Sequence, residues 1–180
     1  MKKNLNSKST PNTKNPISTL EIEIALAKHF GVQKNIIVPN ISYGFDGMHE
    51  CDLFIVSKSG YVSEIEIKIS KADFLKDLNK KHQHIDKQNR INKFYYVMPN
   101  DIYLKVKDLI PINAGIIICT RELNYKKKEY ISVHIEREAK KIKDARKLTF
   151  EEQFKICRLG TMRIFNLKTK YLSLLNKKSN

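Results

Sequence analysis

Residues 51–69, CDLFIVSKSGYVSEIEIKI, decide the fold, because they contain two β-rich runs joined by a short polar loop. Valine, isoleucine and aromatic residues favour strands, and the glycine of the loop at residues 58–60 suits the left-handed position of a three-residue hairpin turn. If that loop centres on its serine, Asp52 on the first strand lies opposite Glu66 on the second. Directly opposed residues are roughly 5 Å apart at Cβ, so these two carboxylates could hold one divalent cation.

The second run alternates between two kinds of side chain. One face carries Val62, Glu64, Glu66 and Lys68, whereas the other is isoleucine at positions 65, 67 and 69. This period of two is typical of a half-buried strand, so we expect one core face and one charged face. An ordinary solvated face with a Glu50–Lys68 ion pair is one interpretation. A metal site is the other, because Asp52 opens an otherwise apolar strand, where a carboxylate needs a partner.

Composition points to a single domain with a polyanionic partner. The chain has 180 residues, enough for one domain with a real core, and a net charge of +15. A field of that size favours nucleic acid, most simply DNA. A general bias toward lysine would also give such a composition, but the positive charges are clustered. The clusters lie at residues 126–128, at residues 140–147 and around Lys76, Lys80 and Lys81.

Several classes of protein are excluded. No apolar run reaches some 18 residues, so we expect no membrane-spanning helix and no membrane partner. The first 16 residues lack the apolar centre of a secretory signal, and residues 1–17 are expected to form a disordered basic arm. The three cysteines form no CxxC motif, which favours buried thiols in the cytoplasm over disulfides or zinc ligands. They are Cys51, Cys119 and Cys157.

A helix is predicted before the hairpin. Ser18 and Glu21 form a capping box at its start, and Gly31 ends it. Helical spacing places Glu23 on the inward stripe, which makes it a stronger site candidate than Glu21 at the cap. The other members of this stripe are Leu20, Leu26, Ala27 and Phe30.

The remaining elements predict one mixed sheet flanked by helices. Ser70 and Asp73 start a second helix, expected from Lys71 to about Ile85, whose N-terminus favours an anion such as phosphate beside the acidic end of the hairpin. Strands at residues 94–98 and 114–120, with a helix at 101–109 between them, predict a parallel pair. Further expectations are a strand at residues 35–42 that Pro39 confines to an edge or bulge, a small polar hairpin at 121–136, and a helix at 149–176 with Gly160 as a candidate break.

This order of elements, with Asp52 on one strand and Glu66-Ile67-Lys68 on the next, resembles the PD-(D/E)XK nuclease superfamily, the restriction-endonuclease-like fold. Cys51 stands where the family has proline. More narrowly, EIEIKISKADF at residues 64–74, with the later FYYVMP and AGIII segments, is similar to the MmcB-like DNA-repair group and related phage-borne proteins. The resemblance implies an α/β fold with an αβββαβ core over residues 18–120. Residues 121–180 would add a basic hairpin and a helical extension packed on that core.

The resemblance also implies roles for particular residues. Asp52 and Glu66, with the carbonyl of Ile67, would hold Mg²⁺ or Mn²⁺, which activates water and neutralises the scissile phosphate. Lys68 would orient or deprotonate that water, or offset charge in the transition state. The acid of the first helix would be Glu23 or, as the weaker candidate, Glu21.

Secondary candidates surround this set. Glu64 would hold a second cation or a water, or lie on the surface, and Glu50 would join the cluster or pair with Lys68, which we favour. Candidate phosphate-binding residues on the second helix are Lys71, Lys80, Lys81 and His82, with a solvated helix face as the alternative. Tyr95 and Tyr96 are expected in the core.

The sequence thus predicts a cytoplasmic, metal-dependent endonuclease or exonuclease acting on DNA in repair, recombination or phage DNA processing. A homodimer is compatible with such an activity. Two alternatives stay open. One is a catalytically inactive nucleic-acid-binding module that keeps the fold, and the other is a structural protein whose charge serves an acidic protein partner.

Overall fold

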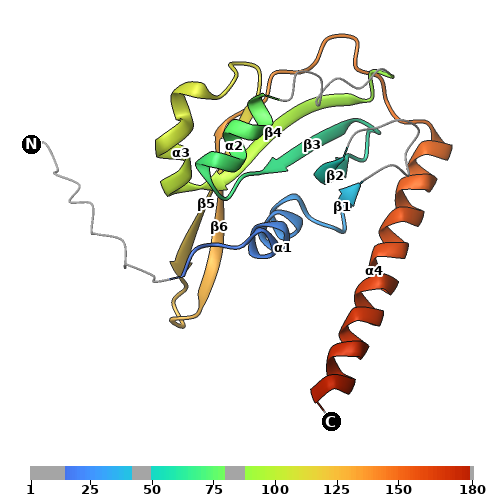
Figure 1. The fold of residues 1–180 in the computed structure, drawn as a ribbon. Coiled ribbons are helices and arrows are strands. Elements are labelled where there is room, and N and C mark those ends of the chain that lie inside the picture. The colour runs from blue at the N-terminus through green and yellow to red at the C-terminus, as the bar shows by residue number, and fades with distance from the viewer. Residues whose placement is uncertain (1–14, 42–49, 80–87, 179–180) are drawn as a thin grey trace, which may run out of the picture.

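The computed structural model describes residues 15–41, 50–79 and 88–178. Within these residues the protein is a mixed α/β fold, in which a six-stranded sheet is flanked by four α-helices (Figure 1). The elements, in chain order, are α1 (Thr19–Phe30), β1 (Ile36–Ile41), β2 (Cys51–Val56), β3 (Val62–Ile67), α2 (Lys71–Leu78), β4 (Ile91–Pro99), α3 (Asn100–Val106) with a 3₁₀ turn (Lys107–Leu109), β5 (Gly115–Leu123), β6 (Glu129–Arg137) and α4 (Phe150–Lys178).

The strands lie in the sheet in the same order as in the chain. β1, β2 and β3 are antiparallel to one another, β3, β4 and β5 are parallel, and β6 is antiparallel to β5. Phe54 pairs with Glu64 and Leu53 with Ile65, which confirms the hairpin register predicted from the loop. The parallel pairing of β4 with β5 is confirmed, and so is the edge position of Pro39 in β1.

Helices cover both faces of the sheet. Ile22 and Leu26 of α1 pack on the face formed by alternate residues of β2 to β5, such as Ile65 and Val97. On the other face, α2 and α3 pack over β4 and β5 in one apolar cluster, and the start of α4 packs over β1 to β3 in another. Successive side chains of a strand point to opposite faces, so nearly continuous apolar strands such as β2 and β5 supply both core faces. Tyr95 and Tyr96 are buried on opposite faces, as expected.

The charged row of β3 is buried, so of the two interpretations the ordinary solvated face is wrong. Glu64, Glu66 and Lys68 are 0%, 7% and 5% exposed. They lie on the face that α2 covers, since Asp77 of α2 contacts Lys68. A buried row of charges needs internal partners, which the candidate site supplies.

The ends of the helices match the expectations only in part. The capping box of Ser18 with Glu21 and the end of α1 at Gly31 are confirmed, but Leu20 is exposed, and the buried residues of α1 are Ile22, Ala25 and Leu26. The Ser70 side chain caps α2 by accepting a hydrogen bond from the N–H of Asp73, but the helix ends at Leu78 and not at about Ile85 as expected. α4 continues through Gly160 without a break.

The polar hairpin expected at residues 121–136 belongs to the main sheet. β5 continues to Leu123, and β6 pairs along it as an edge strand, because the apolar alternation of Ile131, Val133 and Ile135 lets β6 pack against the core beneath α1. The domain boundary expected at residue 120 therefore falls inside a strand. Cys51 and Cys119 are buried as expected, whereas Cys157 is exposed on α4. Most of the arm expected at residues 1–17 lies outside the described residues.

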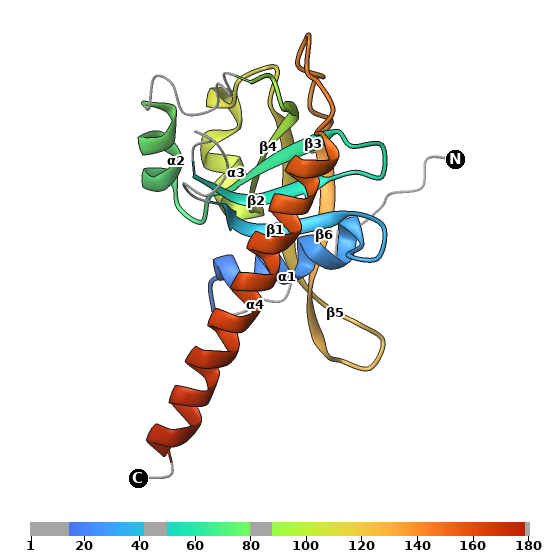
Figure 2. The ribbon, with the colours of Figure 1, turned by 90° about the vertical axis from the view of Figure 1, so that its right-hand side faces the viewer.

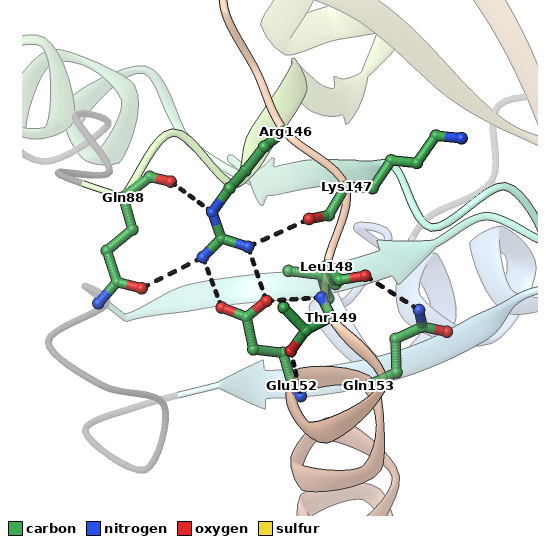
Figure 3. Close-up of polar contacts among 7 residues, drawn as sticks. All are labelled: Gln88, Arg146, Lys147, Leu148, Thr149, Glu152 and Gln153. Carbon is green, nitrogen blue, oxygen red and sulfur yellow. Dashed lines mark hydrogen bonds and ion pairs between the residues drawn. The ribbon is translucent and has the colours of Figure 1, made fainter.

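α4 is attached to the sheet at its N-terminal end and then projects away from the body (Figures 1 and 2). Thr149 and Glu152 form a reciprocal capping box. Figure 3 shows how Arg146 fixes this cap: its guanidinium donates to both carboxylate oxygens of Glu152, at 2.6 and 2.7 Å, and also to the backbone carbonyl and side chain of Gln88. The start of α4 is thereby joined to the segment that leads into β4.

Candidate active site

A cavity of about 320 Å³ lies where β2, β3, α1 and α2 meet, and we call it the acidic cavity. Five carboxylic acids and one ammonium line it, in a chain whose net charge is +15. Its lining residues are Thr19, Glu50, Asp52, Glu66, Ile67, Lys68, Ile69, Asp73 and Asp77. The three motif residues of the hairpin therefore converge on one opening, as the register of β2 and β3 requires.

Asp52 is held by the backbone of the neighbouring strand. Its Oδ2 accepts a hydrogen bond of 2.7 Å from the N–H of Ile67, the last residue of β3. Asp52 is only partly buried, so its carboxylate reaches the cavity from the edge of the sheet. This contact joins the two strands beyond the last paired residues and fixes the orientation of the carboxylate.

Lys68 is sandwiched between two acids. Its Nζ lies 2.8 Å from Oε2 of Glu66 and 3.2 Å from Oδ1 of Asp77. Asp77 in turn accepts a 2.8 Å hydrogen bond from the hydroxyl of Tyr96. The backbone N–H of Lys68 donates to the carbonyl of Val97 on β4. Main chain and side chain therefore both fix the position of the ammonium.

The pKa directions follow from burial and from these contacts. Burial raises the pKa of Asp52, although a backbone N–H and the charge of Lys68 oppose the shift. Burial also raises the pKa of Glu66 to about 7; Lys68 opposes this, and neighbouring carboxylates add to it. Desolvation lowers the pKa of Lys68, but the charges and hydrogen bonds of Glu66 and Asp77 outweigh it, so the pKa is above its ordinary value. These contacts favour the protonated form of Lys68.

The structure distinguishes the two acids of the first helix. Glu23 is half-buried, and its pKa is raised by burial and then by the negative charge of Asp52. Glu21 forms an ion pair of 2.8 Å with Arg121, which together with hydrogen bonds from Ser18 lowers its pKa to about 2. Glu21 lines a different cavity of about 550 Å³ between α1 and β6. Only Glu23 is electrostatically coupled to the acidic cavity, although it does not line it.

The two remaining hairpin acids differ from their expected roles. Glu50 lines the cavity and is exposed, but it does not pair with Lys68, because Glu66 and Asp77 engage that ammonium. Glu64 is fully buried, so a surface role is wrong. It lies on the same side of β3 as Glu66 and raises the pKa of Glu66 through its charge.

Sequence reasoning missed Asp77, Asp73, Tyr96 and Thr19 as site residues. Asp77 is the most consequential, since it is 3% exposed and contacts both Lys68 and Tyr96. One signal was available: Asp73 and Asp77 are four residues apart and share one face of a helix. A buried acid among the lysines of α2 could not be recognised without knowing which face of the helix meets the sheet.

The expected phosphate-binding residues are mostly outside the described part of the chain. Lys71 is exposed at the start of α2, next to the cavity-lining Asp73. Lys80, Lys81 and His82 lie among residues 80–87, which are not described.

The chemistry of the acidic cavity fits a divalent cation. In the described residues, no group of three or more His, Cys, Asp or Glu is placed to hold a metal. Mg²⁺, however, is commonly bound through one or two carboxylates, with water and substrate phosphate completing its shell. Asp52 and Glu66 could supply these two, because Ile67 and Lys68 each engage a single oxygen of the carboxylate. Excess negative charge in a partly buried cavity is the condition that such a cation relieves.

Comparison with known proteins finds a similar fold and gives no information on function. No protein-family model and no curated protein matches the chain. The chain is similar to the solved structure of the SPO1766 protein of unknown function from Silicibacter pomeroyi, with a TM-score of 0.55 and 16% identity, over 92% of this chain and 94% of that one. The part of this chain outside the 92% that is covered is shorter than the 29 residues of α4. At least part of this helix therefore belongs to the shared fold.

Proposed function

We propose that the protein is a divalent-metal-dependent nuclease of the restriction-endonuclease-like fold that hydrolyses DNA phosphodiester bonds. The observation that carries this proposal is the acidic cavity, where five carboxylic acids surround a single ammonium in a strongly basic protein. A basic surface attracts a polyanion, and an acidic cavity within it attracts the cation that phosphodiester hydrolysis uses. The order from α1 through three antiparallel strands and α2 to β4 agrees with the αβββαβ core.

Each residue has a role that its contacts support. Asp52 and Glu66 would hold Mg²⁺ or Mn²⁺, and the carbonyl of Ile67 remains a proposed third ligand. When bound, the metal would lower the pKa of a water and neutralise the phosphate. Lys68, kept protonated between two acids, would place a positive charge near the phosphate, where charge develops. Glu23 would add negative charge close to Asp52.

The experiment that tests this proposal is a cleavage assay with labelled duplex, branched and single-stranded DNA in Mg²⁺, Mn²⁺ or EDTA. Cleavage is expected with either metal and not in EDTA. Asp52→Ala is the site variant, and Asp101→Asn on α3 is the matched control, since Asp101 only forms a surface ion pair with Lys105. Cleavage that persists in EDTA or in Asp52→Ala would argue against this site.

A catalytically inactive DNA-binding module is the second candidate. The ion pair of 2.8 Å between Lys68 and Glu66 favours it, because the lysine engages one of the two proposed metal ligands. Calorimetric titration with Mn²⁺ separates the two. An active site should bind Mn²⁺ in wild type and lose binding in Asp52→Ala, whereas an inactive module should bind DNA with no Mn²⁺ binding at these residues.

A further inference from the structure

α4 exposes an unusual amount of apolar surface. Ten of its large apolar side chains are between 44% and 83% exposed. They are Phe150, Phe154, Met162, Ile164, Phe165, Leu167, Tyr171, Leu172, Leu174 and Leu175. The C-terminal half of the helix extends beyond the rest of the protein in both views (Figures 1 and 2). Exposed apolar patches of this kind mark an interaction surface.

The exposed apolar face extends well beyond the row that contacts the body. Ile156 and Leu159 pack in the apolar cluster over β1 to β3, and the guanidinium of Arg163 donates to the carbonyl of Asn40 on β1. At 100° per residue, one side of this row continues into residues that are polar where the body ends. They are Asn166, Lys170 and Lys177. On its other side the row continues into Leu167 and Leu174, so the apolar face begins at the edge of the contact with the sheet and extends around the exposed side of the helix.

The apolar face is also broad. At 100° per residue, the sector from Leu174 through Ile164 to Phe165 covers about half of the helix circumference and contains nine of the ten exposed side chains, all except Met162. A helix that binds a protein groove presents a narrower row of anchors spaced by three, four and seven residues. A half-cylinder of apolar side chains fits a flat apolar surface better than a groove.

The charges on α4 narrow the choice of partner. Residues 153–180 contain seven lysines and arginines and no aspartate or glutamate. Packing against α4 of a second copy would therefore place positive charges beside positive charges. Nucleic acid would match the charge but not the apolar face. A bilayer with anionic headgroups matches both properties at once.

We propose that α4 lies in the interface of an anionic phospholipid bilayer, with its apolar face toward the acyl chains and its basic residues at the headgroups. Lys168 falls within the apolar sector and folds over the Phe165 ring, with 5.4 Å between Nζ and the ring centroid. Its long stem lets the ammonium reach the headgroups. None of the helices in the described part of the chain is long and apolar enough to cross a membrane. Surface binding needs no such helix, and it departs from the sequence-based expectation of no membrane partner.

The chain contains no tryptophan, so a single introduced tryptophan reports on α4 alone. Ile164→Trp places it at the centre of the apolar face. Ser173→Trp is the matched control, because nine residues at 100° each put Ser173 on the opposite side of the helix. With vesicles of phosphatidylcholine and phosphatidylglycerol, the emission of Ile164→Trp is expected to shift to shorter wavelength and to be quenched by bromolipids. Ser173→Trp should show neither effect, and phosphatidylcholine alone should give a much smaller response.

A second variant separates insertion from adsorption by charge, since a chain of net charge +15 adheres to any anionic surface. The triple variant Leu167→Gln, Tyr171→Gln and Leu174→Gln keeps the charge and should lower vesicle partitioning roughly a hundredfold, because three apolar side chains that would insert into the bilayer are lost. Circular dichroism checks that its helix content is unchanged.

Four outcomes would overturn the proposal. The first is that the triple variant binds vesicles as well as wild type, and the second is that tryptophan emission shifts equally at positions 164 and 173. The third is an emission shift without lipid, accompanied by a doubled mass in light scattering. The fourth is a monomeric protein that binds no vesicles. The third would assign the face to a second copy of the chain.

Discussion

The hydroxyl of Tyr96 on β4 donates a 2.8 Å hydrogen bond to Asp77 on α2, and Asp77 also contacts the ammonium of Lys68 at 3.2 Å. All three residues are buried. Their contacts therefore hold the lysine in place from β4 and α2, which lie outside the hairpin of β2 and β3. The motif residues of β2 and β3 thus depend on elements that follow them in the sequence.

Asp52→Asn should abolish metal-dependent cleavage while leaving the fold intact, because the amide keeps the shape and loses the charge. A drop of about a thousandfold or more is expected if the site supplies several kcal/mol of transition-state stabilisation. Steady-state cleavage rates measure it, and Asp101→Asn provides the comparison. A fall of less than tenfold would place the chemistry elsewhere.

Asp77→Asn should lower the free energy of unfolding by about 1–3 kcal/mol, because the buried Lys68 keeps only one carboxylate partner. Tyr96→Phe should cost less, about 1 kcal/mol, since it removes one hydrogen bond. Urea denaturation measures both changes. The exposed Asp73 provides a control through Asp73→Asn, and equal effects at positions 73 and 77 would contradict the buried ion pair.

Stability should fall as the pH rises toward neutrality. The ordinary pKa of a glutamate is 4.5, whereas that of Glu66 in the folded protein is about 7. The folded state therefore binds the proton more tightly than the unfolded chain, and this advantage is lost between about pH 4.5 and pH 7. The loss amounts to at most about 3 kcal/mol. Denaturation at a series of pH values should show this slope in wild type and a smaller one in Glu66→Gln; an unchanged slope would exclude Glu66 as its source.

Gly115→Ala should destabilise the protein by about 3 kcal/mol or more through overpacking. An added Cβ would overlap the ring of Tyr95 and lie 2.8 Å from the backbone nitrogen of Ala139. Gly160→Ala is the matched control, because its Cβ would lie 3.2 Å from Val38 and alanine favours the helix. We expect it within about 1 kcal/mol of wild type in thermal denaturation. Similar losses at both positions would contradict this difference.

Arg146→Ala should loosen the attachment of α4. Its guanidinium binds Glu152 through both carboxylate oxygens, and we expect a loss of about 1–2 kcal/mol because Arg146 is partly exposed. Hydrogen exchange should increase in the first turn of α4. Lys105→Ala, which breaks the surface pair with Asp101, should cost no more than about 0.5 kcal/mol. No change at the α4 cap would mean that the capping box suffices without the arginine.

Local patterns were enough to predict much of the fold. The glycine of the hairpin loop and the period-2 alternation set the register that pairs Phe54 with Glu64, and the capping box at Ser18 set the start of α1. These features depend on residues close together in the chain, where backbone sterics and local hydrogen bonds dominate.

The amino-acid sequence by itself determined that Asp52, Glu66 and Lys68 would lie at one end of a β-hairpin, because strand pairing is a local consequence of the turn. Only the tertiary structure decided that α2 covers this charged row, that Asp77 rather than Glu50 holds Lys68, and that Glu23 rather than Glu21 is coupled to Asp52. The physical reason is that burial and charge pairing depend on which helix faces pack against the sheet, and the hydrophobic effect that drives this packing is not directional.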